Sequence, residues 1–194
     1  MDQFDFFHIG GDDHYVIPEN LRWAISTGSC KGSWEQSKPL YLGGSLAVSN
    51  KRRYCGGGSG YTINGVALNM LITELWNQSS CFPHWQGPDE DVAISRCFRM
   101  RQIQCMDTND ELEETLWHPW DAAYHSTWNH TKVANWYPTL LDKHQGIKSK
   151  DNMGQISKNS VSFHLKQLKK SDATLPPDSG MRLYHALLYG QCGQ

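Results

Sequence analysis

Two adjacent carboxylates, Asp12 and Asp13, follow an apolar run that ends in two glycines. The run, residues 4–9, predicts a buried strand, and a glycine turn after such a strand can place acidic side chains at the edge of a sheet. Carboxylate oxygens are ligands that hard divalent cations such as Mg²⁺ and Mn²⁺ prefer. A cation bound there could carry a diphosphate and neutralise it as it leaves. A solvated turn is the alternative interpretation of the same two residues.

A second acidic pair, Glu90 and Asp91, lies at the start of a helix that the sequence predicts after Pro88. Acidic residues in a first turn are often only partners of the helix dipole. The same position also aims a carboxylate out of the helix end, where a general base could lie. Farther along, His164 ends a strand-like pattern, and a single histidine in such a place is more often structural than a ligand.

Glycines are dense between Cys55 and Tyr61, at residues 56–58 and 60. Such a stretch lets the backbone approach a ligand closely, although a flexible surface loop has the same composition. The Lys-Ser/Thr ending of a nucleotide P-loop is absent, which argues against that motif. An aromatic-rich segment, residues 117–137, could stack on the faces of sugars or fill a core.

The composition predicts one folded domain over the 194 residues, since 39% are hydrophobic and the formal net charge is only −2. No strongly basic region indicates nucleic acid as a partner. Six cysteines without CxxC pairs argue against a zinc ribbon and favour disulfides in an oxidising compartment. Two glycosylation patterns, at residues 77–79 and 129–131, agree with a secretory route.

Other patterns predict individual elements. Asn64 is a typical N-cap for a helix that ends near Trp76, and Pro18 lies in the first turn of another helix. The elements expected besides these are strands at 39–42, 103–106 and 161–164, helices at 18–25, 89–97 and 181–188, and a mobile loop at 140–160.

Five short blocks occur in a characteristic order: residues 11–17 with 20–23, 57–61, 90–92 running to 96–97, 118–119, and 162–164. Together they resemble the Fringe-like β-1,3-glycosyltransferases of glycosyltransferase family 31, and in particular their core 1 β-1,3-galactosyltransferase branch. The resemblance implies an α/β fold of the GT-A type. The chain would form its C-terminal part and would lack much of the N-terminal nucleotide-binding half.

The resemblance also implies roles for single residues. Asp13 and His164 would bind Mn²⁺, and Asp91 would be the general base. Asp12 and the loop Gly57, Gly58, Ser59, Gly60 and Tyr61 would contact the nucleotide-sugar donor. Glu90, Trp136 and Tyr137 would contact the acceptor, and Cys81 and Cys97 would form a disulfide.

The activity that the resemblance implies is transfer of galactose from UDP-galactose to the 3-hydroxyl of protein-linked N-acetylgalactosamine, with inversion. Such a displacement needs a base on the acceptor hydroxyl and a stabilised leaving group on the opposite side. A non-catalytic relative, acting as a chaperone or glycan-binding module, is the alternative, as is a β-1,3-transferase for another donor sugar. The family acts in the Golgi lumen as type II membrane proteins, and the resemblance allows a homodimer.

Three departures from the family pattern bear on these expectations. Gly11 stands where the family has the first Asp of its metal motif, so one indirect metal contact is lost. The segment at Trp136–Pro138 matches only loosely and lacks a cysteine pair, which affects the acceptor. The metal motif lies at the beginning of the chain, which implies an incomplete donor pocket, exposed sheet edges and a membrane anchor outside this sequence.

Overall fold

The computed structural model describes residues 4–26, 37–49, 52–81, 89–106, 109–112, 114–122, 125, 156–165 and 181. These residues form a mixed α/β arrangement, as the sequence predicted. In chain order the elements are β1 (Phe6–Ile9), β2 (His14–Val16), α1 (Pro18–Ser26), β3 (Tyr41–Gly43), β4 (Ser45–Ser49), β5 (Arg52–Cys55), the 3₁₀ turn η1 (Gly57–Ser59), β6 (Tyr61–Asn64), α2 (Gly65–Met70), the π-helical segment η2 (Leu71–Leu75), α3 (Glu90–Arg99), β7 (Trp117–His118) and β8 (Ser162–His164).

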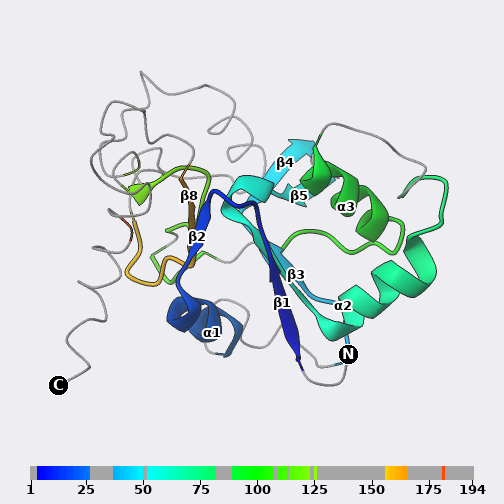
Figure 1. The fold of residues 1–194 in the computed structure, drawn as a ribbon, viewed down its shortest axis with the longest axis horizontal. Helices are drawn as coiled ribbons and strands as arrows, with labels where there is room; N and C mark the ends of the chain where they lie inside the picture. Colours follow the sequence, from blue (N-terminus) through cyan, green and yellow to red (C-terminus); the bar gives the residue numbers. More distant parts are fainter. Residues whose placement is uncertain are drawn as a thin grey trace.

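The first sheet has the order β1-β6-β3, and both of its pairings are antiparallel. Its central strand β6 is buried along its whole length. The elements α2 and α3 lie on one side of β1, and α1 with the β2–β8 pair lies on the other (Figure 1). Because β1 runs directly into the turn before β2, that turn connects the two regions.

The second sheet has the order β2-β8-β7, with β8 antiparallel to β2 and parallel to β7. The register places His14 opposite His164 and Val16 opposite Ser162. Two further backbone bonds extend the pairing, because Leu165 N–H donates to the Asp13 carbonyl (2.7 Å) and Ile17 N–H donates to the Val161 carbonyl (2.8 Å). The pairing therefore joins the segment after the first glycines to a segment nearly 150 residues later. A third sheet is the hairpin of β4 and β5.

Two buried asparagines hold helices against their neighbours. Asn64 is the N-cap of α2, as predicted: its side-chain oxygen accepts from the backbone N–H of Ala67 and of Leu40, both at 2.9 Å. Asn20 of α1 donates from Nδ2 to the carbonyls of Lys158 and Ser160, at 3.0 and 2.7 Å. Each amide thus ties a helix to a segment that leads into a strand, and satisfies buried backbone groups as it does so.

The structure departs from the predicted elements in two places. The expected strand at 103–106 is wrong, because only Met106 pairs, in a single bridge to Leu42. The expected helix 64–76 changes character at Leu71, where a π-helical segment replaces the α-helix. Of the predicted helix 181–188 only Met181 is among the described residues, and of the loop 140–160 only residues 156–160 are. In the described parts of the chain, no helix is long and apolar enough to cross a membrane.

Candidate functional site

The Asp13 carboxylate and the His164 imidazole meet although 151 residues separate them. Asp13 Oδ2 lies 3.1 Å from His164 Nε2. Asp13 is half exposed and His164 is mostly buried. The pairing of β2 with β8 brings them together, since Asp13 directly precedes β2 and His164 is the last residue of β8. The prediction that these two residues lie side by side is met in the fold.

The contact at Nδ1 of His164 determines whether Nε2 of the neutral ring carries a hydrogen. His164 Nδ1 lies 3.1 Å from the carbonyl oxygen of Pro119, and a carbonyl can only accept. Nδ1 therefore carries a hydrogen, and in neutral His164 the lone pair is on Nε2. That lone pair faces a carboxylate oxygen, so two acceptor atoms meet unless a proton or a cation lies between them. Backbone contacts of this kind fix the tautomer of metal-ligating histidines.

The Asp13–His164 pair fits a hard divalent cation by its donor chemistry and spacing. A carboxylate oxygen and an imidazole nitrogen are both ligands of first-row divalent metals. Neighbouring ligands of an octahedral ion, each about 2.1 Å from it, are about 3.0 Å apart, close to the separation here. Among the described residues no group of three or more His, Cys, Asp or Glu side chains could hold a metal. The substrate diphosphate and water would have to supply the remaining ligands.

The Gly57–Ser59 turn connects this pair to Asp91. Gly57 N–H donates to Asp91 Oδ2 at 2.8 Å, while a Cβ on Gly58 would lie within 3.0 Å of the His164 ring. Ser162 of β8 donates its hydroxyl to the Ser59 carbonyl, which fixes the end of the turn. The backbone can pass between Asp91 and His164 only because position 58 has no side chain.

Asp91 lies in the first turn of α3, as predicted. Besides the Gly57 contact, its Oδ1 accepts from the Val92 N–H at 2.7 Å. Each carboxylate oxygen has two lone pairs, so both oxygens retain capacity to accept a proton from a substrate hydroxyl. Asp91, Asp13 and His164 thus lie around one glycine turn.

Glu90 and Tyr61 form a second contact, beside Asp91. Burial, followed by the charge of Asp91, raises the pKa of Glu90, and a hydrogen bond to Tyr61 partly opposes this. Burial raises the pKa of Tyr61 above its usual value, and the charge of Glu90 adds to the shift. Tyr61 is only 1% exposed, so its ring belongs to the core and its hydroxyl to the site.

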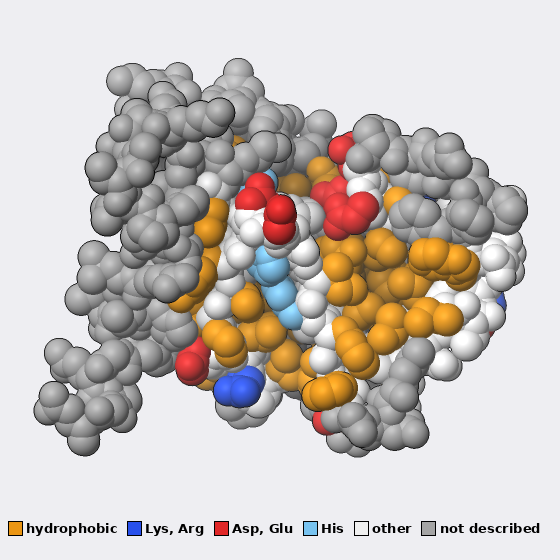
Figure 2. Space-filling model, in the orientation of Figure 1, with side chains coloured by type: hydrophobic (Ala, Val, Ile, Leu, Met, Phe, Trp, Pro, Cys, Tyr) orange, Lys and Arg blue, Asp and Glu red, His pale blue; other side chains and the backbone are white. Residues whose placement is uncertain are grey.

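Acidic side chains gather in two neighbouring patches on one face of the molecule, with a strip of histidines below one patch (Figure 2). The patches lie over the β1–β2 turn and over the start of α3. Asp12, in the turn between β1 and β2, is exposed. No Lys or Arg is seen between the two patches in this view. A site of this charge suits a cation better than a free anion.

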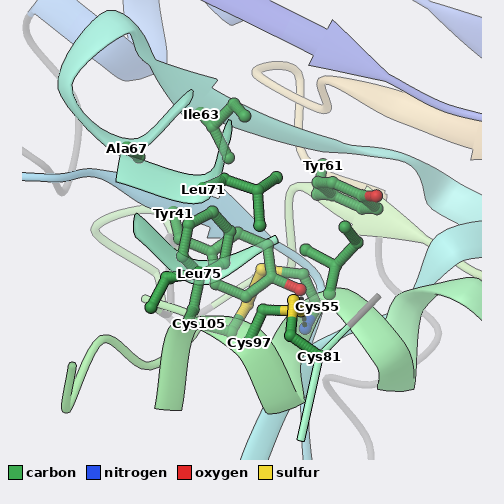
Figure 3. Packing of buried hydrophobic residues seen from close by; sticks show 12 residues of the cluster. Tyr41, Cys55, Tyr61, Ile63, Ala67, Leu71, Leu75, Cys81, Cys97 and Cys105 are labelled. Atoms are coloured by element: carbon green, nitrogen blue, oxygen red, sulfur yellow. Dashed lines mark hydrogen bonds between the residues drawn. A yellow bond between two sulfur atoms is a disulfide. The ribbon is translucent and has the colours of Figure 1, made fainter. Parts of the chain in front are cut away.

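Two disulfides and a buried cluster fix the elements around Asp91. Cys81–Cys97 joins the segment after η2 to α3, as predicted, and Cys55–Cys105 ties the start of the glycine stretch to the segment after α3. The second pair was not predicted, because spacing alone does not reveal connectivity. Both bridges lie in one core cluster with Tyr41, Ile63, Leu71 and Leu75 (Figure 3).

Some residues of the candidate site were not predicted from the sequence, and two predicted ones lie outside the described structure. The unpredicted ones are Pro119, which contacts His164, and the two histidines beside the Gly11–Asp13 turn, His8 and His14. The two histidines flank the glycines at a spacing of six, and this was the available signal. Trp136 and Tyr137 lie outside the described residues.

Comparisons with known proteins show a distant sequence relationship. No model of a protein family matches the chain. Over 138 residues, covering 71% of the chain, it is 28% identical to glycoprotein-N-acetylgalactosamine 3-beta-galactosyltransferase 1 of Xenopus laevis. The match covers 36% of that relative, so the chain spans about a third of its length. The resemblance to galactosyltransferases of the family 31 type is therefore confirmed as a distant sequence relationship.

Proposed function

We propose that this chain forms the metal-binding and base-bearing part of an inverting β-1,3-galactosyltransferase. The donor would be UDP-galactose, and the acceptor would be the 3-hydroxyl of N-acetylgalactosamine linked to a protein. The Asp13–His164 pair carries the proposal, because its two facing acceptor atoms need a proton or a cation between them, and their donor chemistry and spacing suit a divalent cation. The relationship to a galactosyltransferase supports the reaction class.

In this mechanism Asp91 takes the proton of the acceptor hydroxyl as its oxygen attacks C1 of the galactose. The new O–C1 bond forms as the bond from C1 to the diphosphate breaks, and UDP leaves with the electron pair. The Gly57 N–H holds Asp91 in place, and the bare backbone at Gly58 lets a sugar lie against the turn. Mn²⁺ bound by Asp13 and His164 would neutralise the charge of the departing diphosphate.

The pKa of Glu90 is raised, first by burial and then by the charge of Asp91, so Glu90 keeps its proton to a higher pH than a solvated glutamate does. Glu90 is also in place to contact the acceptor. We place the protein in the secretory pathway, in the Golgi lumen, because the two disulfides need an oxidising compartment.

Calorimetric titration with UDP in the presence of Mn²⁺ tests the metal part of this proposal. We expect metal-dependent binding by the wild-type chain, and a loss of at least about 100-fold in Asp13→Asn and His164→Gln, since each removes a ligand. Asp5→Asn is the matched control, because Asp5 is exposed and uses only its backbone carbonyl, which bonds Gly65. Circular dichroism confirms that the variants fold.

Transfer is tested with radiolabelled galactose and an N-acetylgalactosamine glycopeptide, using the longest natural form of the protein. UDP-N-acetylglucosamine in parallel distinguishes another donor sugar. Metal-dependent UDP binding without transfer of any sugar would favour the non-catalytic alternative, a chaperone or glycan-binding relative. Absence of any Mn²⁺ binding, with or without UDP, would contradict the metal site itself.

A further inference from the structure

We propose that His14, held in place by His8 and Thr62, positions the turn Gly11–Asp13 so that Asp13 meets His164. This inference rests on the proposed function, because it assigns a purpose to the Asp13–His164 pair. His14 and His8 would be positioning residues that do not touch the substrate. Position 11 is glycine, so no carboxylate at that position can hold the turn. His14 and His8 would hold it instead.

The three side chains form a continuous line of hydrogen bonds that ends on the metal turn. His14 Nδ1 lies 2.6 Å from the Gly11 carbonyl, His14 Nε2 lies 3.0 Å from His8 Nε2, and His8 Nδ1 lies 2.9 Å from Thr62 Oγ1. The carbonyl can only accept, so His14 Nδ1 donates to it. His14 Nε2 then accepts from His8 Nε2–H, and His8 Nδ1 accepts from the threonine hydroxyl. All four ring nitrogens are satisfied with both histidines neutral.

Burial agrees with this neutral arrangement at His8. Burial first, and the neighbouring His14 second, lower the pKa of His8 to about 4. At neutral pH His8 therefore carries no charge and donates through one nitrogen only. The direction of the hydrogen bonds follows from the geometry, and the pKa of His8 is consistent with it.

The line of hydrogen bonds begins in the rigid part of the fold. Thr62 is fully buried in β6, the central strand of the first sheet, and it lies directly opposite His8 in the β1–β6 register. His14 belongs to β2 in the second sheet, where it lies opposite His164. The three residues thus connect the two sheets at the turn that Asp13 occupies. The Gly11 end of the turn is thereby linked to the first sheet, while the Asp13 end is linked to β8 through the Leu165 N–H.

Two glycines make room for the two rings. A Cβ on Gly10 would lie within 3.0 Å of three atoms of the His14 ring. A Cβ on Gly60 would lie within 3.0 Å of His8 Nε2, and Gly60 has a positive φ of 71° as well. The backbone is therefore shaped around both imidazoles, as expected for side chains whose position matters.

Gly11 explains why this arrangement is needed. A Cβ on Gly11 would lie 2.9 Å from Asp13 Oδ1, so a side chain there would push the carboxylate aside. The glycine leaves Asp13 free to reach His164, but it also leaves the turn without a side chain of its own to hold it. The His14 contact to the Gly11 carbonyl supplies that restraint.

The test compares His14→Ala with His14→Asn, with metal-dependent UDP binding as the readout. Asparagine can place its side-chain N–H near the position of Nδ1 and keep the bond to the Gly11 carbonyl. We expect His14→Ala to weaken Mn²⁺-dependent binding by about 10- to 100-fold, the usual effect of removing a partner that orients a ligand. His14→Asn should recover most of the affinity. Equal losses in the two variants would overturn the inference.

A second pair of variants tests the buried end. Thr62→Val removes the hydroxyl that bonds His8, and we expect a loss of about threefold to tenfold in the same affinity. Thr73→Val is the matched control, because Thr73 is exposed and bonds only the Asn69 carbonyl of its own helix. If both valine variants bind like the wild type, the line does not extend to Thr62 and the proposal fails.

Nitrogen NMR of the imidazole rings provides a readout that does not depend on activity. We expect hydrogen on Nδ1 of His14, on Nε2 of His8 and on Nδ1 of His164. Hydrogen on Nδ1 of His8 would overturn the proposed direction. Should the wild-type chain bind no Mn²⁺, the proposed function fails while the NMR result still decides whether the line exists. If the wild type binds Mn²⁺ and His14→Ala binds equally well, only the present inference fails.

Discussion

The two halves of the site are assembled by different means. Asp13 and His164 meet through strand pairing between segments 151 residues apart, without a covalent link of their own. Asp91 lies on α3, which a disulfide joins to a cysteine only 16 residues earlier. The glycine turn at 57–59 contacts both halves.

Because of this difference, the Asp13–His164 pair and Asp91 should be sensitive to different substitutions. Closing a long loop costs more entropy than closing a short one, and only non-covalent contacts offset that cost at the Asp13–His164 pair. Asp91, the proposed base, is held by local helix geometry and a cross-link. Changes to the disulfide should therefore affect the base side, whereas changes to the β2–β8 contacts should affect the metal side.

The largest effect expected is on transfer, through the base. Asp91→Asn should lower kcat by about 10³-fold, because the proton acceptor is lost. Metal-dependent UDP binding should remain within about threefold, since the metal ligands lie on the other half. Asp89→Asn is the matched control, because Asp89 is the N-cap of α3 but makes no capping hydrogen bond with its side chain. A parallel loss of metal binding in Asp91→Asn would show that the two halves are not separable.

The second largest effect is expected from removing the disulfide Cys81–Cys97. Replacing both Cys81 and Cys97 by Ala should lower the free energy of unfolding by about 3 kcal/mol, from the loop entropy of 16 residues. Urea unfolding measures this. At a temperature where the variant stays folded, we expect transfer to fall more than Mn²⁺ affinity. The reverse order would contradict the separation of the halves.

Lowering the pH should change the free energy of unfolding in opposite directions through His8 and through Glu90. His8 has its pKa lowered to about 4 from 6.5, so the unfolded chain takes up a proton in this window while the folded chain does not. The free energy of unfolding should therefore fall by about 3 kcal/mol between pH 6.5 and 4. Burial and His125 lower the pKa of His118 as well, which adds to the same trend.

Glu90 works in the other direction, because its raised pKa favours the protonated folded state. Its contribution is present below the ordinary pKa of 4.5 and is lost as the pH rises through the raised value. Urea unfolding of His8→Gln and Glu90→Gln across pH 4–8 separates the two contributions. His8→Gln should reduce the fall in unfolding free energy toward acid pH, and Glu90→Gln should remove the fall toward neutral pH. An unchanged acid slope in His8→Gln would contradict the assignment.

The smallest effect expected is at the connection between the halves. Ser162→Ala removes the buried hydroxyl that bonds the Ser59 carbonyl, and should cost about 1–2 kcal/mol of unfolding free energy. Ser26→Ala is the control, since the exposed Ser26 bonds only within its own helix, and it should change stability by less than about 0.5 kcal/mol. Equal effects on both proteins would show that β8 does not hold the turn.

Local chemistry was enough to predict several features of this protein. The Asn64 cap, the start of α3 at Glu90 and the strand before the glycines all follow from short-range patterns, because capping and strand formation depend on neighbours in sequence. The family pattern predicted the Cys81–Cys97 bridge, which the structure contains, and the roles that it implies for Asp13, Asp91 and His164 stay predictions.

Only the tertiary structure decided how those residues meet. The β2–β8 register, the bond from His164 to Pro119, the Cys55–Cys105 bridge and the line from Thr62 to His14 all join segments that local patterns do not connect. Strand register depends on which faces are buried once the sheets pack. The type of a residue does not indicate which distant residue it contacts. The sequence by itself therefore determined which chemical groups are available, and the packing of the two sheets determined which of them face one another.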